Sequence, residues 1–268
     1  MRRRAVIDAV FLLVALAAAA PFVLPLAGIA TGPAGDDLRL YVGNLSKLAF
    51  LACAAVASFM AAARFEPDNP MRPVWRRMAA GLVTFVAGEV VLATYQVVWR
   101  MPSPFPSLAD AFFIVAYPFL LAALVRAISA YAETGYPIGS RRERVGTVVA
   151  VGLASVLVGY PVLKPALEVP AAPLAMALNV AYPVLDLAVL VPVIILLRIA
   201  ARFRGGEVWK VWAGLLAGFL LMTLADVLFA YFTATGKARL DELVDATYIL
   251  SYAALGRGAL GQYQLLRD

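Results

Sequence analysis

The chain has 268 residues, of which 63% are apolar and 15% charged, with a net charge of +6, one cysteine and no histidine. This apolar excess excludes an ordinary soluble domain, and basic residues confined to short segments between apolar blocks give no indication of nucleic-acid binding. The lack of histidine excludes His-ligated haem, most zinc sites and histidine proton relays, and the single Cys53 excludes an intrachain disulfide.

The apolar residues come in continuous blocks of about twenty, the length that crosses a hydrocarbon layer as an α-helix. The blocks lack strand-like alternation, so we predict an all-α, polytopic membrane helix bundle that forms a single integral membrane domain over residues 1–268. The first block follows three arginines like a signal peptide, but it extends to about Ala30, so we expect it to be retained. About eight transmembrane helices are expected, near 5–30, 43–64, 75–99, 107–131, 145–162, 172–200, 208–233 and 240–263.

Basic residues are concentrated in every second loop between the expected helices and at the two ends of the chain. This set comprises Arg2, Arg3, Arg4, Arg64, Arg72, Arg76, Arg77, Arg141, Arg142, Arg144, Arg202, Arg204, Lys210 and Arg267. The opposite loops hold Arg39, Arg100, Lys164, Lys237 and Arg239, diluted by Asp36, Asp37, Glu168, Asp241 and Glu242. Since cytoplasmic loops are enriched in Lys and Arg, we predict a multi-pass protein of the cell (inner) membrane with a cytoplasmic N-terminus and a cytoplasmic C-terminus.

An internal repeat links the third and fourth expected helices to the seventh and eighth. Both copies contain an aromatic residue, a glycine and an acid in one helix, then Asp and Tyr in the next. The matched pairs are Trp75 and Trp212, Gly81 and Gly218, Glu89 and Asp226, Asp110 and Asp245, and Tyr117 and Tyr252. We therefore predict two copies of one hairpin that cross the membrane in the same direction, an arrangement that often places a binding site between the copies. Chance similarity between apolar helices is the alternative.

Acids within membrane spans are costly and usually face the bundle interior or a wet cavity. We predict a ligand-binding pocket between helices 3, 4, 6, 7 and 8 that opens to the outer side. It would be formed by these acids, by tyrosines at similar depth and by Lys47 as a cationic partner. The candidate residues are Lys47, Glu89, Asp110, Tyr117, Tyr182, Asp186, Asp226, Asp245 and Tyr252. The alternatives are helix capping for Asp110 and Asp245, an aromatic belt for the tyrosines and snorkelling for Lys47.

No catalytic constellation is complete in the sequence, which contains no nucleophile–histidine pair, Walker loop, Gly-rich phosphate motif or metal-ligand cluster. We therefore predict no catalytic residue, no metal site and no cofactor.

The string Pro106-Ser107-Leu108-Ala109-Asp110, followed by Ala116-Tyr117-Pro118, resembles the PSxAD…YP signature of a bacterial multi-helix membrane sensor region. The segment 182–187, the Ala225-Asp226 pair and Asp245 with Tyr252 extend the resemblance over most of helices 3–8. That region commonly precedes GGDEF diguanylate cyclase, EAL phosphodiesterase or kinase domains.

Two departures from this family accompany the resemblance. The sequence ends at Asp268 without an output domain, and the last helix carries Arg257, Gly258 and Gly261 where the family favours an apolar, Ala-rich end. We expect either the membrane portion of a longer protein or a chain that works through a partner.

The leading hypothesis is a non-enzymatic, sensory and signal-transducing membrane module with an outer-side polar pocket. Its expected partners are the lipid bilayer, an unidentified small-molecule or lipid ligand, and a cytoplasmic output domain or signalling partner, with no nucleic acid. One rival is a small-solute transporter, which also uses midplane acids and a repeat. The other is a membrane-embedded lipid hydrolase with paired carboxylates, similar to the eight-helix lysoplasmalogenases, which needs two acids within reach of one water.

Overall fold

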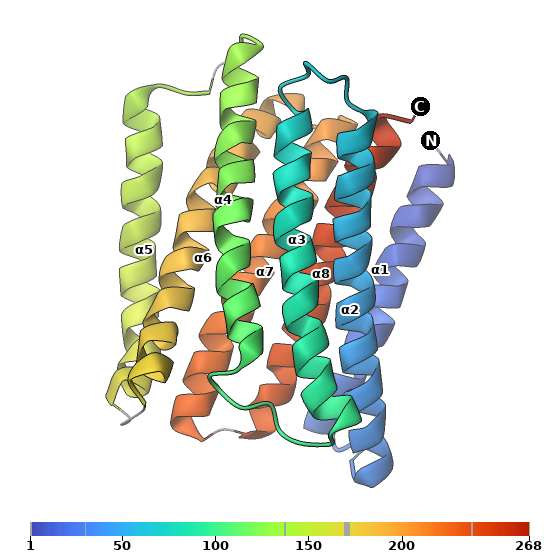
Figure 1. The fold of residues 1–268 in the computed structure, drawn as a ribbon, viewed down its shortest axis with the longest axis vertical. Coiled ribbons are helices and arrows are strands. Elements are labelled where there is room, and N and C mark those ends of the chain that lie inside the picture. Colours follow the sequence, from blue (N-terminus) through green and yellow to red (C-terminus); the bar gives the residue numbers. More distant parts are fainter. Residues whose placement is uncertain (1, 30, 137, 169–171, 237, 268) are drawn as a thin grey trace.

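A computed structural model describes residues 2–29, 31–136, 138–168, 172–236 and 238–267 (Figure 1). All regular structure in these ranges is helical. The long helices are α1 (Arg2–Val23), α2 (Pro33–Arg64), α3 (Arg72–Ala93), α4 (Leu108–Glu133), α5 (Arg141–Glu168), α6 (Pro173–Ala200), α7 (Glu207–Thr235) and α8 (Ala238–Leu265). Short helical turns follow α1 (η1, Leu24–Ala27), α3 (η2, Thr94–Val98) and α6 (η3, Ala201–Phe203).

The chain is an all-helical membrane protein. Within the described ranges, α1, α2, α3, α4, α6 and α7 are long and apolar enough to cross a membrane by length and composition. All eight expected helices are present. The expected end of the first helix, Ala30, and the expected outer-side Lys237 lie outside the described residues.

The largest boundary error concerns α2, which begins at Pro33 and not near position 43. Its first turns are charged, so they do not register as part of an apolar block. Pro33 fits the first turn of a helix because its missing N–H has no partner to lose there. Asp36 lies near the positive end of the helix dipole and accepts a hydrogen bond of 2.5 Å from Arg39 one turn later.

Six helices form a closed ring. α2 packs on α3, α3 on α4, α4 on α6, α6 on α7, α7 on α8, and α8 returns to α2. The remaining two are peripheral, since α1 lies against α8 and α2 while α5 lies against α6 and α7. All run along a common axis (Figure 1). The ring therefore encloses an interior in which buried side chains of these helices pack together.

Two helix pairs approach especially closely, each at a glycine. A methyl group on Gly81 of α3 would lie 2.8 Å from Leu120 Cδ2 of α4. A methyl group on Gly218 of α7 would lie 2.6 Å from Leu255 Cδ2 of α8. The two hairpins also meet each other through tryptophan, because the rings of Trp75 and Trp212 lie with their centroids 6.4 Å apart.

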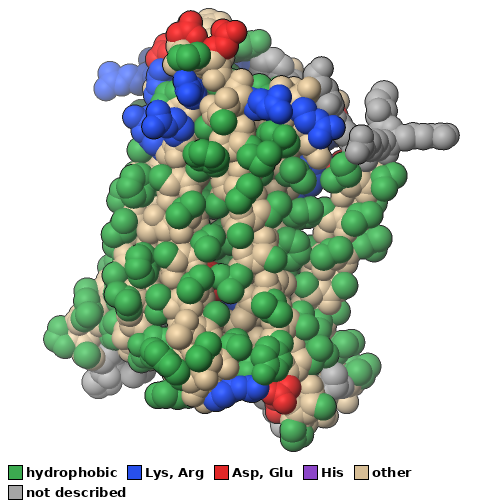
Figure 2. Space-filling model, turned by 45° about the vertical axis from the view of Figure 1, so that its right-hand side comes forward, with side chains coloured by type: hydrophobic (Ala, Val, Ile, Leu, Met, Phe, Trp, Pro, Cys, Tyr) green, Lys and Arg blue, Asp and Glu red, His purple; other side chains and the backbone are tan. Residues whose placement is uncertain are grey.

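Charge is distributed unevenly along the bundle axis. Both termini lie at one end (Figure 1), and most of the visible Lys and Arg side chains gather at that end (Figure 2). Hydrophobic side chains cover the flanks of the bundle in the same view. Large apolar residues such as Leu13, Phe59 and Leu157 are exposed there. An apolar girdle between charged ends is the surface that a bilayer requires.

Candidate functional site

Four of the candidate acids accept a hydrogen bond from a tyrosine hydroxyl. Tyr117 of α4 donates to Asp186 Oδ1 of α6 at 2.7 Å, and Tyr252 of α8 donates to Glu89 Oε1 of α3 at 2.8 Å. Glu89 and Asp186 are buried, with 3% and 1% of their surface exposed, as expected for acids that face the bundle interior. These bonds join helices that are far apart in the sequence, so the acids hold the ring together.

Asp110 caps a helix, as one of the two alternatives for it predicts, and also bonds to a neighbouring helix. Its Oδ2 accepts the backbone N–H of Ser107 at 2.6 Å, which completes a capping box at the start of α4. Its Oδ1 accepts the hydroxyl of Tyr182 from α6 at 2.7 Å. The carboxylate therefore caps the start of α4 and also binds α6.

Tyr248 of α8 donates to Asp226 of α7. Asp226 also lies within interaction distance of the Asp186 carboxylate across the α6–α7 contact. Among the described residues, Asp186 Oδ2 and Glu89 Oε2 are buried without a hydrogen-bond partner. We call the eight residues of these pairs the tyrosine–carboxylate cluster: Glu89, Asp110, Asp186, Asp226, Tyr117, Tyr182, Tyr248 and Tyr252.

Lys47 provides a cation for the acids. Its Nζ lies 2.8 Å from Asp245 Oδ1, which joins α2 to α8. Lys47 is 5% exposed, so its ammonium is held inside the bundle and does not snorkel to the surface. Glu89 also attracts this ammonium. The ion pair thus connects the cluster to the end of the bundle opposite the termini.

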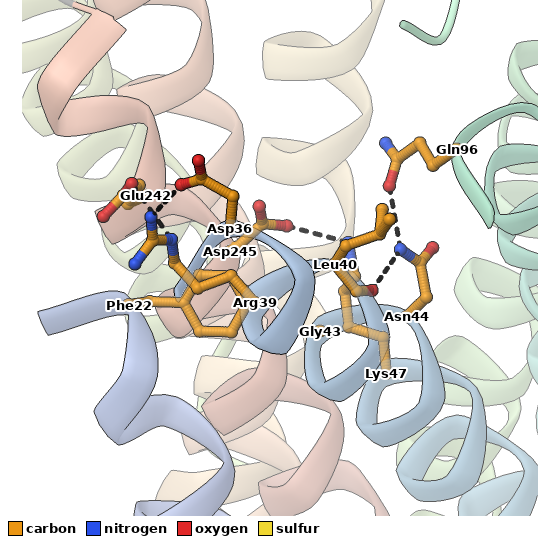
Figure 3. Close-up of a pocket in the computed structure, with 10 residues that line it drawn as sticks. All are labelled: Phe22, Asp36, Arg39, Leu40, Gly43, Asn44, Lys47, Gln96, Glu242 and Asp245. Atoms are coloured by element: carbon orange, nitrogen blue, oxygen red, sulfur yellow. Dashed lines mark hydrogen bonds and ion pairs between the residues drawn. The ribbon is translucent and has the colours of Figure 1, made fainter. Parts of the chain in front are cut away.

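A pocket of about 240 Å³ opens at that end (Figure 3). Its walls come from α1, α2, the π-helical turn η2 and α8. The lining residues are Phe22, Asp36, Arg39, Leu40, Gly43, Asn44, Lys47, Gln96, Glu242 and Asp245. Of the candidate residues, Lys47 and Asp245 line the pocket and the others belong to the tyrosine–carboxylate cluster.

This cavity lies between α1, α2, η2 and α8, and not between helices 3, 4, 6, 7 and 8, where a pocket stays a prediction. Tyrosine rings occupy part of the space between those helices. Tyr117 and Tyr182 lie with ring centroids 6.5 Å apart, and Tyr248 and Tyr252 with centroids 6.0 Å apart. These rings occupy space between α4, α6 and α8, whereas the Phe22 ring of α1 occupies the space that Gly43 leaves free on α2.

Polar groups line the pocket and bind one another across helices (Figure 3). Asn44 Nδ2 donates to Gln96 Oε1 at 2.9 Å, which ties α2 to η2. Arg39 Nε lies 3.2 Å from Glu242 Oε1, which ties α2 to α8. In the described structure, Asn44 Oδ1 and Glu242 Oε2 are buried acceptors without a donor. The site therefore holds both signs of charge and spare acceptor capacity.

Sequence reasoning missed Asn44, Gln96, Arg39 and Glu242 as pocket residues. A signal was present for two of them, because Asn44 precedes Lys47 by three residues and Gln96 follows Glu89 by seven, which places each on the face of a known site residue. The sequence indicates only loop charges at Arg39 and Glu242, because Arg39 precedes the apolar block of α2 and Glu242 lies in the charged first turns of α8.

Among the described residues, no group of three or more His, Cys, Asp or Glu side chains is arranged to hold a metal ion. Comparison of the chain with known protein families, with curated proteins and with solved structures finds no match.

Proposed function

We propose that this chain is a ligand-responsive signalling module of the cell membrane, in which the α2–α8 pocket takes a small polar ligand and α8 carries the response to the cytoplasmic end. One observation carries the proposal. The ion pair between Lys47 and Asp245 lines the pocket and at the same time joins α2 to α8, the two helices that supply most of its walls. A ligand that binds there competes directly for the contact between α2 and α8.

The proposal includes eight spans with both termini in the cytoplasm. The gathering of basic residues at the end that holds the termini supports this orientation. Residues 145–163 of α5 contain no charged side chain, so α5 is apolar enough to span. α8 carries charges, but Asp245 is paired with Lys47 and Arg257 with Asp8, which lowers the cost of placing it among the other helices.

We also propose that the hairpins α3–α4 and α7–α8 are two copies of one unit. The close glycine contacts at Gly81 and Gly218 support this, as do Tyr117 and Tyr252, which occupy matched positions and each bind a buried acid of another helix.

α8 is the element best placed to transmit a change. Along its length it is bonded to α2 through Asp245, to α7 through Tyr248, to α3 through Tyr252 and to α1 through Arg257. Packed interfaces of this kind switch between discrete arrangements and do not deform continuously. A ligand shifts such an equilibrium only by its preference for one arrangement, about 1.4 kcal/mol for each tenfold preference.

The chemistry of the pocket favours a ligand with N–H donors. Asn44 Oδ1 and Glu242 Oε2 are acceptors that lack a donor among the described residues, and buried acceptors favour a partner. Asp36, Glu242 and Asp245 face Arg39 and Lys47, so both charge signs are present. A small molecule with an amino group beside an anionic group suits these walls.

The test fuses a diguanylate cyclase domain to the C-terminus of the full chain and measures cyclic di-GMP in cells. We expect Lys47→Met and Asp245→Asn each to change the output severalfold, and the charge exchange Lys47→Asp with Asp245→Lys to restore it in part. Lys210→Met is the matched control, since Lys210 pairs with Glu207 at the opposite end of the bundle. If the pocket variants insert normally and signal like the control, the signalling proposal fails.

The lipid-hydrolase rival has one observation in its favour, the proximity of Asp186 and Asp226. Paired carboxylates can activate a water molecule between them. Incubation of the purified protein with lysophospholipids separates the two functions. Release of a headgroup or aldehyde that is lost in Asp186→Asn and retained in Lys47→Met would replace the signalling proposal with the enzyme. If instead the protein takes up a solute into proteoliposomes, and this uptake is lost in Asp186→Asn and retained in Lys47→Met, a transporter would replace the signalling proposal.

A further inference from the structure

A second pocket, of about 250 Å³, lies at the end of the bundle that holds the termini. It is bounded by the segment before α5, the first turn of α5 and the last turns of α6. Three arginines line it, Arg144 from α5, Arg198 from the end of α6 and Arg202 from η3, with one acid, Glu143. The charged lining is therefore strongly cationic, in contrast to the mixed charge of the α2–α8 pocket.

Two of the arginines are held in place by α5. Arg144 Nη1 donates to the carbonyl of Gly139 at 2.8 Å, and Arg198 Nη1 donates to Thr147 Oγ1 at 2.8 Å. Glu143 lies 3.7 Å from Arg198 Nη2, too far for a strong hydrogen bond. A guanidinium has five N–H donors in a planar fork, so both groups keep donors for a further acceptor while their positions are fixed.

The rest of the pocket is apolar. Ile138, Ile195 and Ile199 complete its wall. The adjoining surface of α5 is also apolar and exposed, with Val145 and Val149 about half accessible. A cationic mouth beside an exposed apolar helix surface matches a molecule with an anionic head and a hydrocarbon tail.

We infer that this pocket binds a phosphate group. Arginine forks bind the oxygens of phosphate in pairs, which a rigid site with several guanidinium groups favours over a single carboxylate. The pocket lies at the end of the apolar helix α6, and in the orientation proposed above this end is cytoplasmic, where basic pockets between helices bind anionic headgroups. The phosphate of an anionic phospholipid is therefore the favoured source, and a soluble phosphate is the other.

The experiment measures thermal unfolding of the full chain in nanodiscs of phosphatidylcholine, with and without phosphatidylglycerol, and separately in phosphatidylcholine with inorganic pyrophosphate. We expect a rise in Tm of the wild type with at least one of these. Protection by the lipid alone assigns the site to a headgroup, and protection by pyrophosphate as well assigns it to phosphate in general.

The variants decide whether this pocket is responsible. Arg202→Gln removes a guanidinium for which the described part of the chain shows no hydrogen bond or ion pair, so its fold is retained, and Arg144→Gln with Arg198→Gln removes the two held groups. Arg76→Gln with Arg77→Gln is the matched control, because both are exposed on α3 at the same end. We expect the protection to be reduced in the pocket variants and kept in the control. Equal protection of all variants, or no protection of the wild type, overturns the inference, and neither result bears on the α2–α8 pocket.

Discussion

Lys47 and Asp245 are 198 residues apart in the sequence and form a 2.8 Å ion pair in which the cation is the buried partner. The Lys47 side chain is 7% exposed and the Asp245 side chain 42% exposed, because the carboxylate faces the pocket. A group that enters the pocket therefore reaches Asp245 first. Two acids balance the charge of the lysine, since Asp245 is in direct contact with Nζ and Glu89 also attracts it.

This asymmetry predicts unequal effects of removing each partner. Asp245→Ala leaves an ammonium buried without its closest anion, and we expect a loss of about 2 kcal/mol in unfolding free energy, between the values for exposed and buried pairs. Lys47→Met leaves only a half-exposed carboxylate and should cost less. Unfolding of the micelle-solubilised protein by SDS measures the unfolding free energy of both single variants. The double variant completes a double-mutant cycle, which gives the coupling energy of the pair. Equal costs for the two single variants would contradict the buried-cation interpretation.

The hydroxyl of Tyr252 is the described donor to Glu89, whose second oxygen has no partner among the described residues. Tyr252→Phe therefore leaves a buried carboxylate unsatisfied, and we expect a loss of about 1–3 kcal/mol. Tyr160→Phe removes the same atom from an exposed tyrosine on α5 and serves as the control. The same SDS titration measures both variants. If the two cost the same, the bond to Glu89 contributes nothing to stability.

At Asp186 the identity of the replacement decides the outcome. Asn keeps an acceptor for the Tyr117 hydroxyl and replaces one of two neighbouring acids by a neutral amide, so we expect Asp186→Asn to be at least as stable as the wild type. Leu has no acceptor and leaves the buried Tyr117 hydroxyl unpaired, which should cost about 1–3 kcal/mol. Thermal unfolding in detergent compares the two. A similar loss for both would show that the carboxyl group itself stabilises the bundle.

The helices could be predicted because each long apolar block specifies one, whatever its neighbours are. The acids and tyrosines could be identified as candidate site residues because polar side chains are costly within membrane spans. Their partners could not be predicted. Asp110 and Tyr117 share a helix face, yet the first binds Tyr182 and the second Asp186, both from α6. Which helices close the ring depends on packing among many weak contacts, and the location of the pocket follows from that packing.

The last prediction tests whether the two hairpins are built alike. A methyl group at Gly218 meets Leu255 Cδ2 at 2.6 Å, and one at Gly81 meets Leu120 Cδ2 at 2.8 Å, both too close for a real contact. We expect Gly81→Ala and Gly218→Ala each to cost about 1–3 kcal/mol through overpacking. Within the described structure, nothing lies within 4 Å of a methyl group at Gly152 of α5, so Gly152→Ala is the control.

The control should be neutral or slightly stabilising, because alanine favours a helix over glycine by about 0.5–1 kcal/mol. If the hairpins are equivalent, removing the clashing leucine should have the same effect in both. Leu120→Ala should offset part of the cost of Gly81→Ala, and Leu255→Ala part of the cost of Gly218→Ala. The two coupling energies measured by SDS unfolding should therefore have the same sign. A large cost at one glycine and none at the other would mean that the resemblance between the hairpins does not extend to their packing. Their proposed relation as copies of one unit would then have to be given up.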